Sequence, residues 1–284
     1  MSGFSPEWLA MREAADLAAR APSVLEAVRK AYADAPRCRI WDLGAGTGAS
    51  LRAFAESLPV EQHWTLVDHD PANLAAAVPA LEAWAETGTQ SDAGLALGKG
   101  CQRILVRQQP ADLSQLPAGA VPWQREAPDL ITASALLDLT SADWVEAFAE
   151  ACVASRSAVL ATLTFDGRLD FSPAHEDDAA VRDAFAAHQR GDKGFGLALG
   201  PDATAVLATA LKGRSYRVIT AESPWRLGRQ DGPLLVALVD GIAEAVAETD
   251  RLPQSRLAAW REQRMTKLES LIVGHEDLFG YWSD

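Results

Sequence analysis

Three alternating glycines at the end of an apolar strand constrain this chain more than any other feature. The segment Ile40-Trp-Asp-Leu-Gly-Ala-Gly-Thr-Gly-Ala49 leads through Asp42 into Gly44, Gly46 and Gly48, and a helical pattern follows. Glycine allows a sharp backbone turn and lets a ligand approach the main chain closely. The helix behind the turn offers unpaired N–H groups at its N-terminus. The segment therefore predicts a ligand site at a strand-to-helix turn.

Apolar segments and helical patterns alternate around this turn. We expect buried strands at 38–43, 64–67, 104–106, 130–132 and 158–165, with helices at 50–57, 71–85 and 142–154. Such alternation is typical of a parallel sheet with helices on both faces, so the predicted fold class is α/β and Rossmann-like. The stretch 87–100 is rich in Gly, Ser and Thr, and we expect it to be a long connection.

The two ends of the chain are more helical. A helical segment begins after Ser5, which precedes Pro6 as a cap residue, and extends to Ala33. The last third is expected to contain helices at 178–189, 201–211, 234–248 and 255–271, a strand at 216–220 and a final strand after Leu271. No linker separates these parts. We expect a single domain over 1–284, made of an N-terminal helical segment (1–37), a cofactor-binding core (38–165) and a substrate cap with the final strands (166–284).

The glycine turn by itself fits two classes of cofactor. Gly44-x-Gly46-x-x-Ala49 also satisfies the dinucleotide fingerprint. However, Asp42 precedes the first glycine by two residues, and its carboxylate repels a pyrophosphate but attracts the cationic amino group and sulfonium of S-adenosylmethionine. The glycine strand also follows a helical segment instead of opening the chain. Both observations favour S-adenosylmethionine.

At these residues the sequence resembles the class I S-adenosylmethionine-dependent methyltransferases. Asp42-Leu-Gly-Ala-Gly-Thr-Gly48 matches the first motif of that family at each defining position. The softer matches are Thr65-Leu-Val-Asp68 to the second motif, Ala111-Asp-Leu113 to the adenine-contacting segment and Pro128-Asp-Leu-Ile-Thr-Ala-Ser-Ala-Leu-Leu137 to the fourth motif. The resemblance covers residues 38–165. It implies a seven-stranded, mostly parallel sheet whose last strand is antiparallel.

The resemblance also implies roles for single residues. Asp68, 24 residues after Gly44, would hold both ribose hydroxyls, and Asp112 would face the adenine amino group. The residues implied in cofactor binding are Asp42, Gly44, Ala45, Gly46, Thr47, Gly48, Asp68, His69, Asp112, Leu113, Ser134 and Ala135. Other interpretations stay open: Asp68 as a helix cap, for which Asp70 is better placed, Asp112 as a loop carboxylate, and Ser134 as a loop residue.

Methyl transfer depends on holding the acceptor in line and excluding water, and it needs no covalent enzyme intermediate. A base is required only if the acceptor arrives protonated, and the sequence shows no catalytic triad. His188 is the candidate base, because histidine exchanges protons near neutral pH; the alternative is an exposed histidine at a helix end. The candidate substrate residues are Asp138, Phe165, Asp166, Arg190 and Phe195. Asp138 has an alternative as a cap residue, and Asp166-Gly167 as a hairpin turn.

The composition excludes several classes of partner. With 39 acidic and 26 basic residues the net charge is −13, which disfavours nucleic acid and anionic membranes. Three separated cysteines indicate a reducing compartment, and the clusters at His175 and His275 lack metal-ligand spacing. The N-terminus does not resemble a signal peptide, and no apolar run is long enough to span a membrane. We expect a cytoplasmic protein without a metal, and we leave a homodimer open.

The sequence predicts an S-adenosylmethionine-dependent methyltransferase with a small-molecule acceptor, because the large C-terminal cap suits an enclosed substrate. S-adenosylmethionine is the expected cofactor. Two alternatives remain open, an NAD(P)-dependent Rossmann oxidoreductase and a non-catalytic S-adenosylmethionine-binding protein. The sequence does not specify the acceptor or the atom that is methylated.

Overall fold

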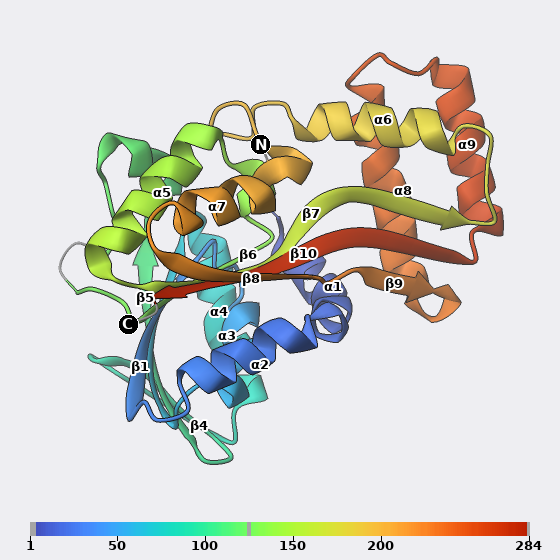
Figure 1. Ribbon diagram of the computed structural model, residues 1–284. Coiled ribbons are helices and arrows are strands. Elements are labelled where there is room, and N and C mark those ends of the chain that lie inside the picture. Colours follow the sequence, from blue (N-terminus) through green and yellow to red (C-terminus); the bar gives the residue numbers. More distant parts are fainter. Residues whose placement is uncertain (1–3, 124–125, 283–284) are drawn as a thin grey trace.

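A central sheet with helices on both sides dominates the computed structural model, which describes residues 4–123 and 126–282 (Figure 1). In these residues ten strands form the sheet, in the order β3-β4-β5-β2-β1-β6-β7-β10-β8, and β9 pairs with β10 beside this path. The predicted α/β fold class is confirmed.

The middle of the sheet is parallel. β1 (Arg37–Leu43), β2 (Glu61–Asp68), β5 (Gln102–Pro110), β6 (Leu130–Ser134) and the first half of β7 (Ala158–Ser172) run in one direction. β10 (Ser270–Trp282) lies antiparallel between β7 and β8 (Tyr216–Glu222). The run from β5 to β8 is therefore the expected seven-stranded sheet with an antiparallel last strand.

Successive residues of a strand point to opposite faces of the sheet, so buried strands present apolar side chains on both faces. A layer of helices covers each face. Ile40 packs with α2 (Pro22–Ala31), α3 (Ala49–Phe54) and α4 (Pro71–Trp84). Its neighbour Trp41 packs on the other face with α5 (Ala142–Ser155) and α7 (Ala203–Lys212). The short 3-10 helices in the connections are η1 (Ala55–Ser57), η2 (Leu113–Ala118), η3 (Leu137–Leu139), η4 (Gly200–Asp202) and η5 (Arg229–Asp231).

A third hydrophobic cluster forms where β7 and β10 extend beyond the parallel sheet as an antiparallel ribbon (Figure 1). It contains α6 (Asp178–Gln189), α8 (Gly232–Ala247), α9 (Gln254–Lys267) and β9 (Trp225–Gly228). The N-terminal helix α1 (Pro6–Ala19) contacts β9 and α8 of this cluster and also α4 of the sheet core. We call this third cluster, with its ribbon, the cap.

Several sequence predictions about single elements are wrong. The expected connection at 87–100 is the hairpin β3 (Thr87–Ser91) and β4 (Gly94–Lys99), which extends the sheet beyond β5, so the sheet has ten strands instead of seven. β3 is exposed along its whole length and therefore carries no alternating apolar signal. The alternative hairpin turn at Asp166-Gly167 is also wrong, because β7 continues there as a bulge opposite Gly274.

No helix among the described residues is both long and apolar enough to cross a membrane.

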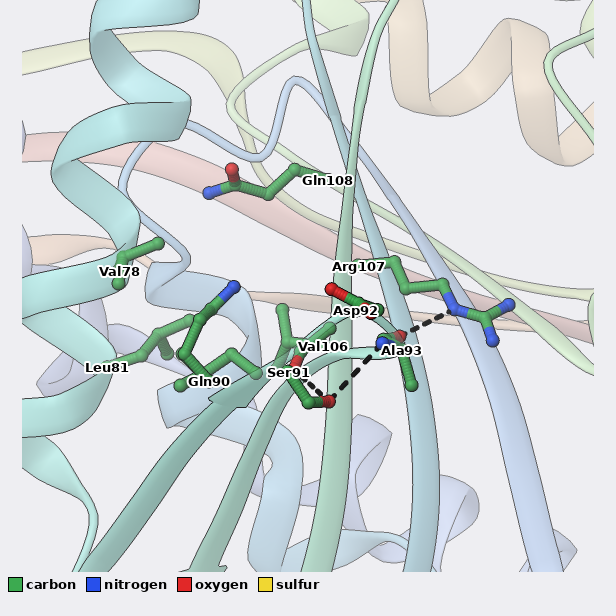
Figure 2. A pocket seen from close by; sticks show the side chains of 11 residues that line it. Val78, Leu81, Gln90, Ser91, Asp92, Ala93, Val106, Arg107 and Gln108 are labelled. Atoms are coloured by element: carbon green, nitrogen blue, oxygen red, sulfur yellow. Dashed lines mark hydrogen bonds between the residues drawn. The ribbon is translucent and has the colours of Figure 1, made fainter.

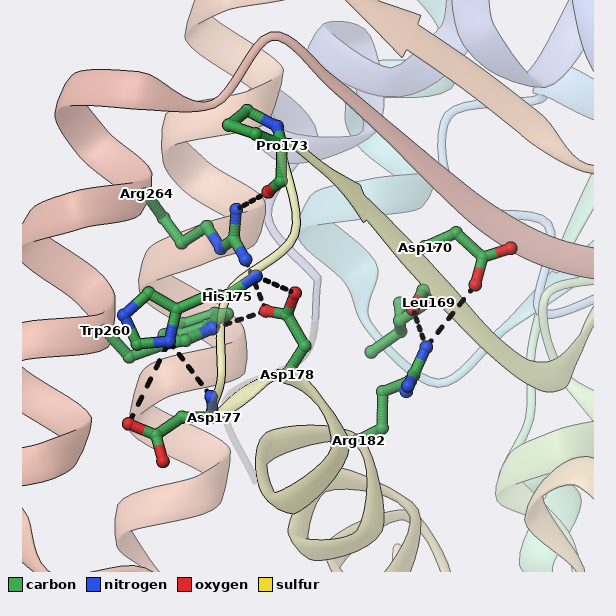
Figure 3. A network of polar contacts seen from close by, with 9 residues as sticks. All are labelled: Leu169, Asp170, Pro173, His175, Asp177, Asp178, Arg182, Trp260 and Arg264. Atoms are coloured by element: carbon green, nitrogen blue, oxygen red, sulfur yellow. Dashed lines mark hydrogen bonds and ion pairs between the residues drawn. The ribbon is translucent and has the colours of Figure 1, made fainter.

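A buried polar network joins α6 to α9 inside the cap (Figure 3). The Asp178 carboxylate accepts hydrogen bonds from the backbone N–H of His175 at 2.8 Å, from Nε1 of Trp260 at 2.9 Å and from the guanidinium of Arg264. Arg264 also donates to the carbonyl of Pro173, and its guanidinium lies 5.0 Å from the ring centre of Phe171. Asp178 therefore holds three segments of the cap together.

Replacing Asp178 by Ala leaves a buried guanidinium and an indole N–H without their acceptor. Removing one partner of a buried pair of this kind costs about 3–5 kcal/mol. We expect D178A to lower the free energy of unfolding by that amount in urea titrations. D183A, on the exposed face of the same helix, is the matched control and should change it by less than about 0.5 kcal/mol. Equal effects of the two substitutions would contradict a structural role for the network.

Candidate functional site

The glycine turn follows β1 and has a left-handed backbone. The φ angles of Gly44, Gly46 and Gly48 are +64°, +53° and +78°, which L side chains rarely adopt. At Gly46 an added Cβ would lie 2.8 Å from a methyl carbon of Leu9, so the end of the Leu9 side chain would have to move. The turn is thus built for close approach, and the N-terminal helix α1 covers it.

Asp42 is fully buried directly before this turn. Its Oδ1 accepts a hydrogen bond from the hydroxyl of Thr132 at 2.6 Å, while Oδ2 has no partner among the described residues. Burial raises the pKa of Asp42 to about 7, although the hydroxyls of Thr132 and Ser50 and the charge of Arg20 favour the ionised form. The carboxyl group therefore lacks a protein partner that would stabilise its charge in full.

Asp68, at the end of β2, is tied to the glycine turn. Its Oδ2 accepts the backbone N–H of Gly46 at 2.8 Å, and its Oδ1 accepts the N–H of Asp70 at 2.9 Å. Asp70, and not Asp68, caps α4 by accepting the N–H of Ala72. The interpretation of Asp68 as a helix cap is therefore wrong. Its carboxylate fixes the turn relative to β2.

Arg20 brings a positive charge to the same place. This residue at the end of α1 is 7% exposed, and its side chain donates to the hydroxyls of Thr162 at 2.5 Å and of Ser134 at 3.4 Å. No carboxylate in the described residues lies within ion-pair distance of it, and its Nε has no partner. Burial lowers the pKa of Arg20, and the more distant charges of Asp277, Asp16 and Asp42 oppose this effect.

The N-terminal helix that covers the turn has its polar side inward. Arg12 and Asp16 are buried and form a bidentate ion pair, whereas Met11 and Leu17 are 41% and 46% exposed. A helix that packs on a hydrophobic core shows the opposite distribution. The underside of α1 therefore faces a polar environment. Asp16 also contacts the cap, because its carboxylate accepts a hydrogen bond from the indole N–H of Trp225.

A second group of unpartnered polar atoms lies deeper under α1. Asp138, in η3, and His275, in β10, are 9% and 6% exposed, and neither Oδ1 of Asp138 nor Nδ1 of His275 has a partner among the described residues. Burial raises the pKa of Asp138 to about 6 and lowers that of His275 to about 3. The charge of Arg12 acts on both groups.

Unpartnered buried polar atoms thus concentrate around α1. The atoms in or facing the N-terminal segment are Nε1 of Trp8, Nε of Arg20, Oδ2 of Asp42, Oδ1 of Asn73, Oδ1 of Asp138 and Nδ1 of His275. Each such group costs about 1–3 kcal/mol when it is left without a partner, and a domain has only about 5–15 kcal/mol of net stability. Buried groups of this kind find their partners in bound water or in a polar ligand. The concentration marks this region as the candidate site.

The structure brings most of the predicted cofactor residues together. Asp42, the glycine turn, Asp68, Ser134 and Ala135 all lie at the carboxyl ends of β1, β2 and β6. Asp112 is different, because it caps η2 by accepting the N–H of Ser114 at 3.0 Å and is exposed to solvent. His69 is exposed beside Asp68, and Leu113 is buried in the second cluster. Their binding roles stay predictions.

The predicted substrate residues divide into two groups. Asp138 and Phe165 lie near the underside of α1, and Asp166 lies one residue further along β7. The other two make contacts elsewhere: Arg190 pairs with Asp202 at 3.0 Å, and Phe195 packs against Trp144. His188, the candidate base, pairs with Glu248 at 3.0 Å. The structure therefore does not bring His188 to the glycine turn.

Sequence reasoning missed Arg20 and His275. Arg20 follows an amphipathic segment and looks like a solvated helix end, and His275 lies in the sequence of an edge-like final strand. The signal that reveals both is a buried side-chain nitrogen without a partner, and this burial depends on segments far apart in the chain. No set of three or more His, Cys, Asp or Glu side chains in the described residues is arranged to hold a metal ion.

A pocket at the opposite edge of the sheet is separate from this site. It lies between α4 and the β4-β5 pair and is lined by residues that include Val78, Leu81, Gln90 and Gln108 (Figure 2). None of the predicted site residues lines it. A second pocket, beside Asp170 and Arg182 on the cap, likewise contains none of them.

Comparison with known proteins supports the fold. No protein-family model and no curated protein matches the sequence. The solved structures similar to this chain include a cyclopropane-fatty-acyl-phospholipid synthase-like protein from Lactobacillus casei (15% identity, 95% of this chain and 91% of that chain, TM-score 0.51). Others are precorrin-6y C5,15-methyltransferase from Geobacter metallireducens (10%, 92% and 87%, TM-score 0.43) and phosphoethanolamine N-methyltransferase 2 from Haemonchus contortus (10%, 99% and 58%, TM-score 0.46).

Of these three likenesses, the first has a TM-score above 0.5, and at 15% identity it shows the fold. The likeness supports the Rossmann-like fold that the sequence resemblance implies.

The buried carboxyl of Asp42 makes stability depend on pH. Its folded-state pKa of about 7 lies above the ordinary value, so the folded protein loses stability as the pH rises through that value. D42N removes this loss. We expect the stability of D42N relative to wild type to rise by on the order of 2–3 kcal/mol between pH 5 and pH 8 in urea titrations. The exposed D34N is the control, and a pH-independent difference would contradict the raised pKa.

Proposed function

We propose that this protein binds S-adenosylmethionine at the glycine turn and transfers its methyl group to a small molecule. The observation that carries the proposal is a pair of opposite, incompletely partnered charges beside the turn, Asp42 and Arg20. The amino-acid end of S-adenosylmethionine carries an ammonium and a carboxylate. It supplies a cation for Asp42 and an anion for Arg20, and both ligand groups form charge-assisted hydrogen bonds.

The neighbouring residues fit the rest of the same ligand. Asp68 already aligns the turn through Gly46, and a carboxylate has further lone pairs with which to accept ribose hydroxyls. Ser134 and Ala135, at the end of β6, border the same edge. Asp112 would accept the adenine amino group from its exposed position after β5.

The turn is poorly suited to a dinucleotide. A pyrophosphate binds through free backbone N–H groups of the glycine turn. Here the N–H of Ala45 donates to Val67, that of Gly46 to Asp68 and that of Gly48 to Ala45. Two buried carboxylates also lie beside the turn and would repel the phosphates. This arrangement favours the methyl donor over the oxidoreductase alternative.

When bound, S-adenosylmethionine supplies a methyl group activated by its sulfonium. The chain's own contribution is to bind, orient and enclose. Asp42 and Arg20 fix the amino-acid end of the donor, and α1 closes the site against water, which favours transfer to the acceptor over hydrolysis. Leu9 rests on Gly46, so this part of α1 must shift before the donor reaches that face of the turn.

Calorimetry tests the choice of cofactor. We expect the wild-type protein to bind S-adenosylmethionine and S-adenosylhomocysteine and not NADH or NADPH. D42A should weaken S-adenosylmethionine binding at least about tenfold, because the ammonium loses its counter-charge. The exposed D34A is the control. Binding of a nicotinamide dinucleotide without binding of either adenosyl compound would refute the proposal.

Arg20 is tested with two ligands that differ in the amino-acid end. S-adenosylhomocysteine carries the carboxylate, and 5′-methylthioadenosine lacks it. We expect R20Q to weaken S-adenosylhomocysteine about 10–100-fold, the value of a charged hydrogen bond, and to change methylthioadenosine less than about threefold. R29Q, on the exposed side of α2, should affect neither. An equal loss for both ligands would show that Arg20 supports the fold instead of the carboxylate.

A further inference from the structure

The unpartnered groups under α1 extend beyond what a methyl donor at the glycine turn requires. Asp138 and His275 lie on the cap side, where the extended halves of β7 and β10 leave the parallel sheet. Phe165 connects them: its backbone amide favours the ionised carboxyl of Asp138, it pairs with His275 across the two strands, and the two rings lie 6.5 Å apart. The two polar atoms without partners therefore belong to one small region.

Aromatic rings and α1 enclose this region. The indole of Trp225 lies 5.0 Å from the His275 ring, and the guanidinium of Arg12 lies 4.8 Å from the indole centre. Phe185, in α6, packs on Phe165 at 5.7 Å. Core residues of this kind normally surround apolar side chains. Here they pack around an imidazole, and the carboxyl of Asp138 interacts with the backbone of Phe165 beside it; this combination suits a small, partly aromatic molecule.

The electrostatic potential restricts the charge of that molecule. Arg12, Arg20 and Arg168 all act on His275 and disfavour its protonated form. Burial, which is the largest cause of the lowered pKa of His275, acts together with these charges to disfavour an acceptor that arrives as an ammonium ion, and a neutral acceptor is favoured. A hydroxyl compound meets this condition, whereas a simple aliphatic amine is a cation at neutral pH.

We propose that Asp138 and His275 form the polar wall of the acceptor site and that Oδ1 of Asp138 takes the proton of a small hydroxyl compound. The inference rests on the proposed methyl transfer. In the transfer, the acceptor oxygen gains the methyl carbon as the carbon–sulfur bond breaks with its electron pair on sulfur, and the hydroxyl proton passes to Asp138. The ring of His275 borders the acceptor on the side of Phe165. His188, on the outer side of the cap with Glu248, takes no part.

Asp138 has the properties that the proton transfer needs. Its raised pKa of about 6 leaves it ionised at neutral pH, yet makes it more basic than an exposed carboxylate. Its unpartnered oxygen has no competing donor among the described residues.

Two probe molecules test the acceptor site. Phenol is a neutral hydroxyl compound, and benzylamine is a cation of similar size. Calorimetry is carried out on wild type, D138N and H275F, first with S-adenosylhomocysteine alone and then with each probe in its presence. We expect phenol to bind wild type more tightly than benzylamine, and each variant to weaken phenol at least about tenfold. The affinity for S-adenosylhomocysteine should stay within about threefold.

Melting temperatures separate a binding role from a structural one. A polar group kept for a ligand destabilises the free protein, so we expect H275F to melt about 2–4 °C higher than wild type. D143N and H63F, at sites outside this region, are the matched controls.

The outcomes distinguish the two proposals. Failure of S-adenosylhomocysteine to bind wild type contradicts the proposed function. With that binding intact, the acceptor site is overturned if phenol does not bind, if it binds all three proteins equally, if benzylamine binds more tightly, or if H275F melts well below wild type.

Discussion

The site depends on the hydrogen bond between Asp68 and the backbone of Gly46. It joins the end of β2 to a left-handed turn after β1 that glycine alone adopts without strain. With the turn fixed, the carboxyl of Asp42 is held under it in a position fully removed from water. The parallel sheet thus places two buried carboxyl groups side by side at two neighbouring strand ends, and the other charged groups of the site are arranged around them.

How much of this follows from the sequence depends on the range of the interactions. The glycine turn, Asp42 and the parallel strands are encoded within short segments, and they were predictable. The β3-β4 hairpin was not, because exposed strand residues pair by backbone hydrogen bonds that leave no apolar pattern. Only some residues of the candidate site were predictable from the sequence. Asp138 directly follows a recognisable motif, but the importance of Arg20 and His275 is visible only in the folded chain, where residues more than 100 positions apart are buried together.

The prediction of His188 as the base rests on residue type and on a nearby glycine-rich turn. A histidine near a glycine-rich turn is chemically suitable, and its sequence neighbours give no hint of its place in the fold. The structure pairs it with Glu248 at the end of α8, whereas the extended β7-β10 ribbon brings another histidine to the underside of α1. The ribbon is therefore the element that decides which side chains approach the glycine turn, and its length is set by pairing along fifteen residues of β7.

The inverted polarity of α1 connects stability to function. Burying Arg12, Asp16 and Arg20 beneath a helix that exposes Met11 and Leu17 gives up hydrophobic burial and leaves Nε of Arg20 without a partner. A ligand that completes the hydrogen bonds of such a region stabilises the folded chain in proportion to its affinity. A core of better hydrophobic packing at this position would be more stable and would offer a ligand no polar partners.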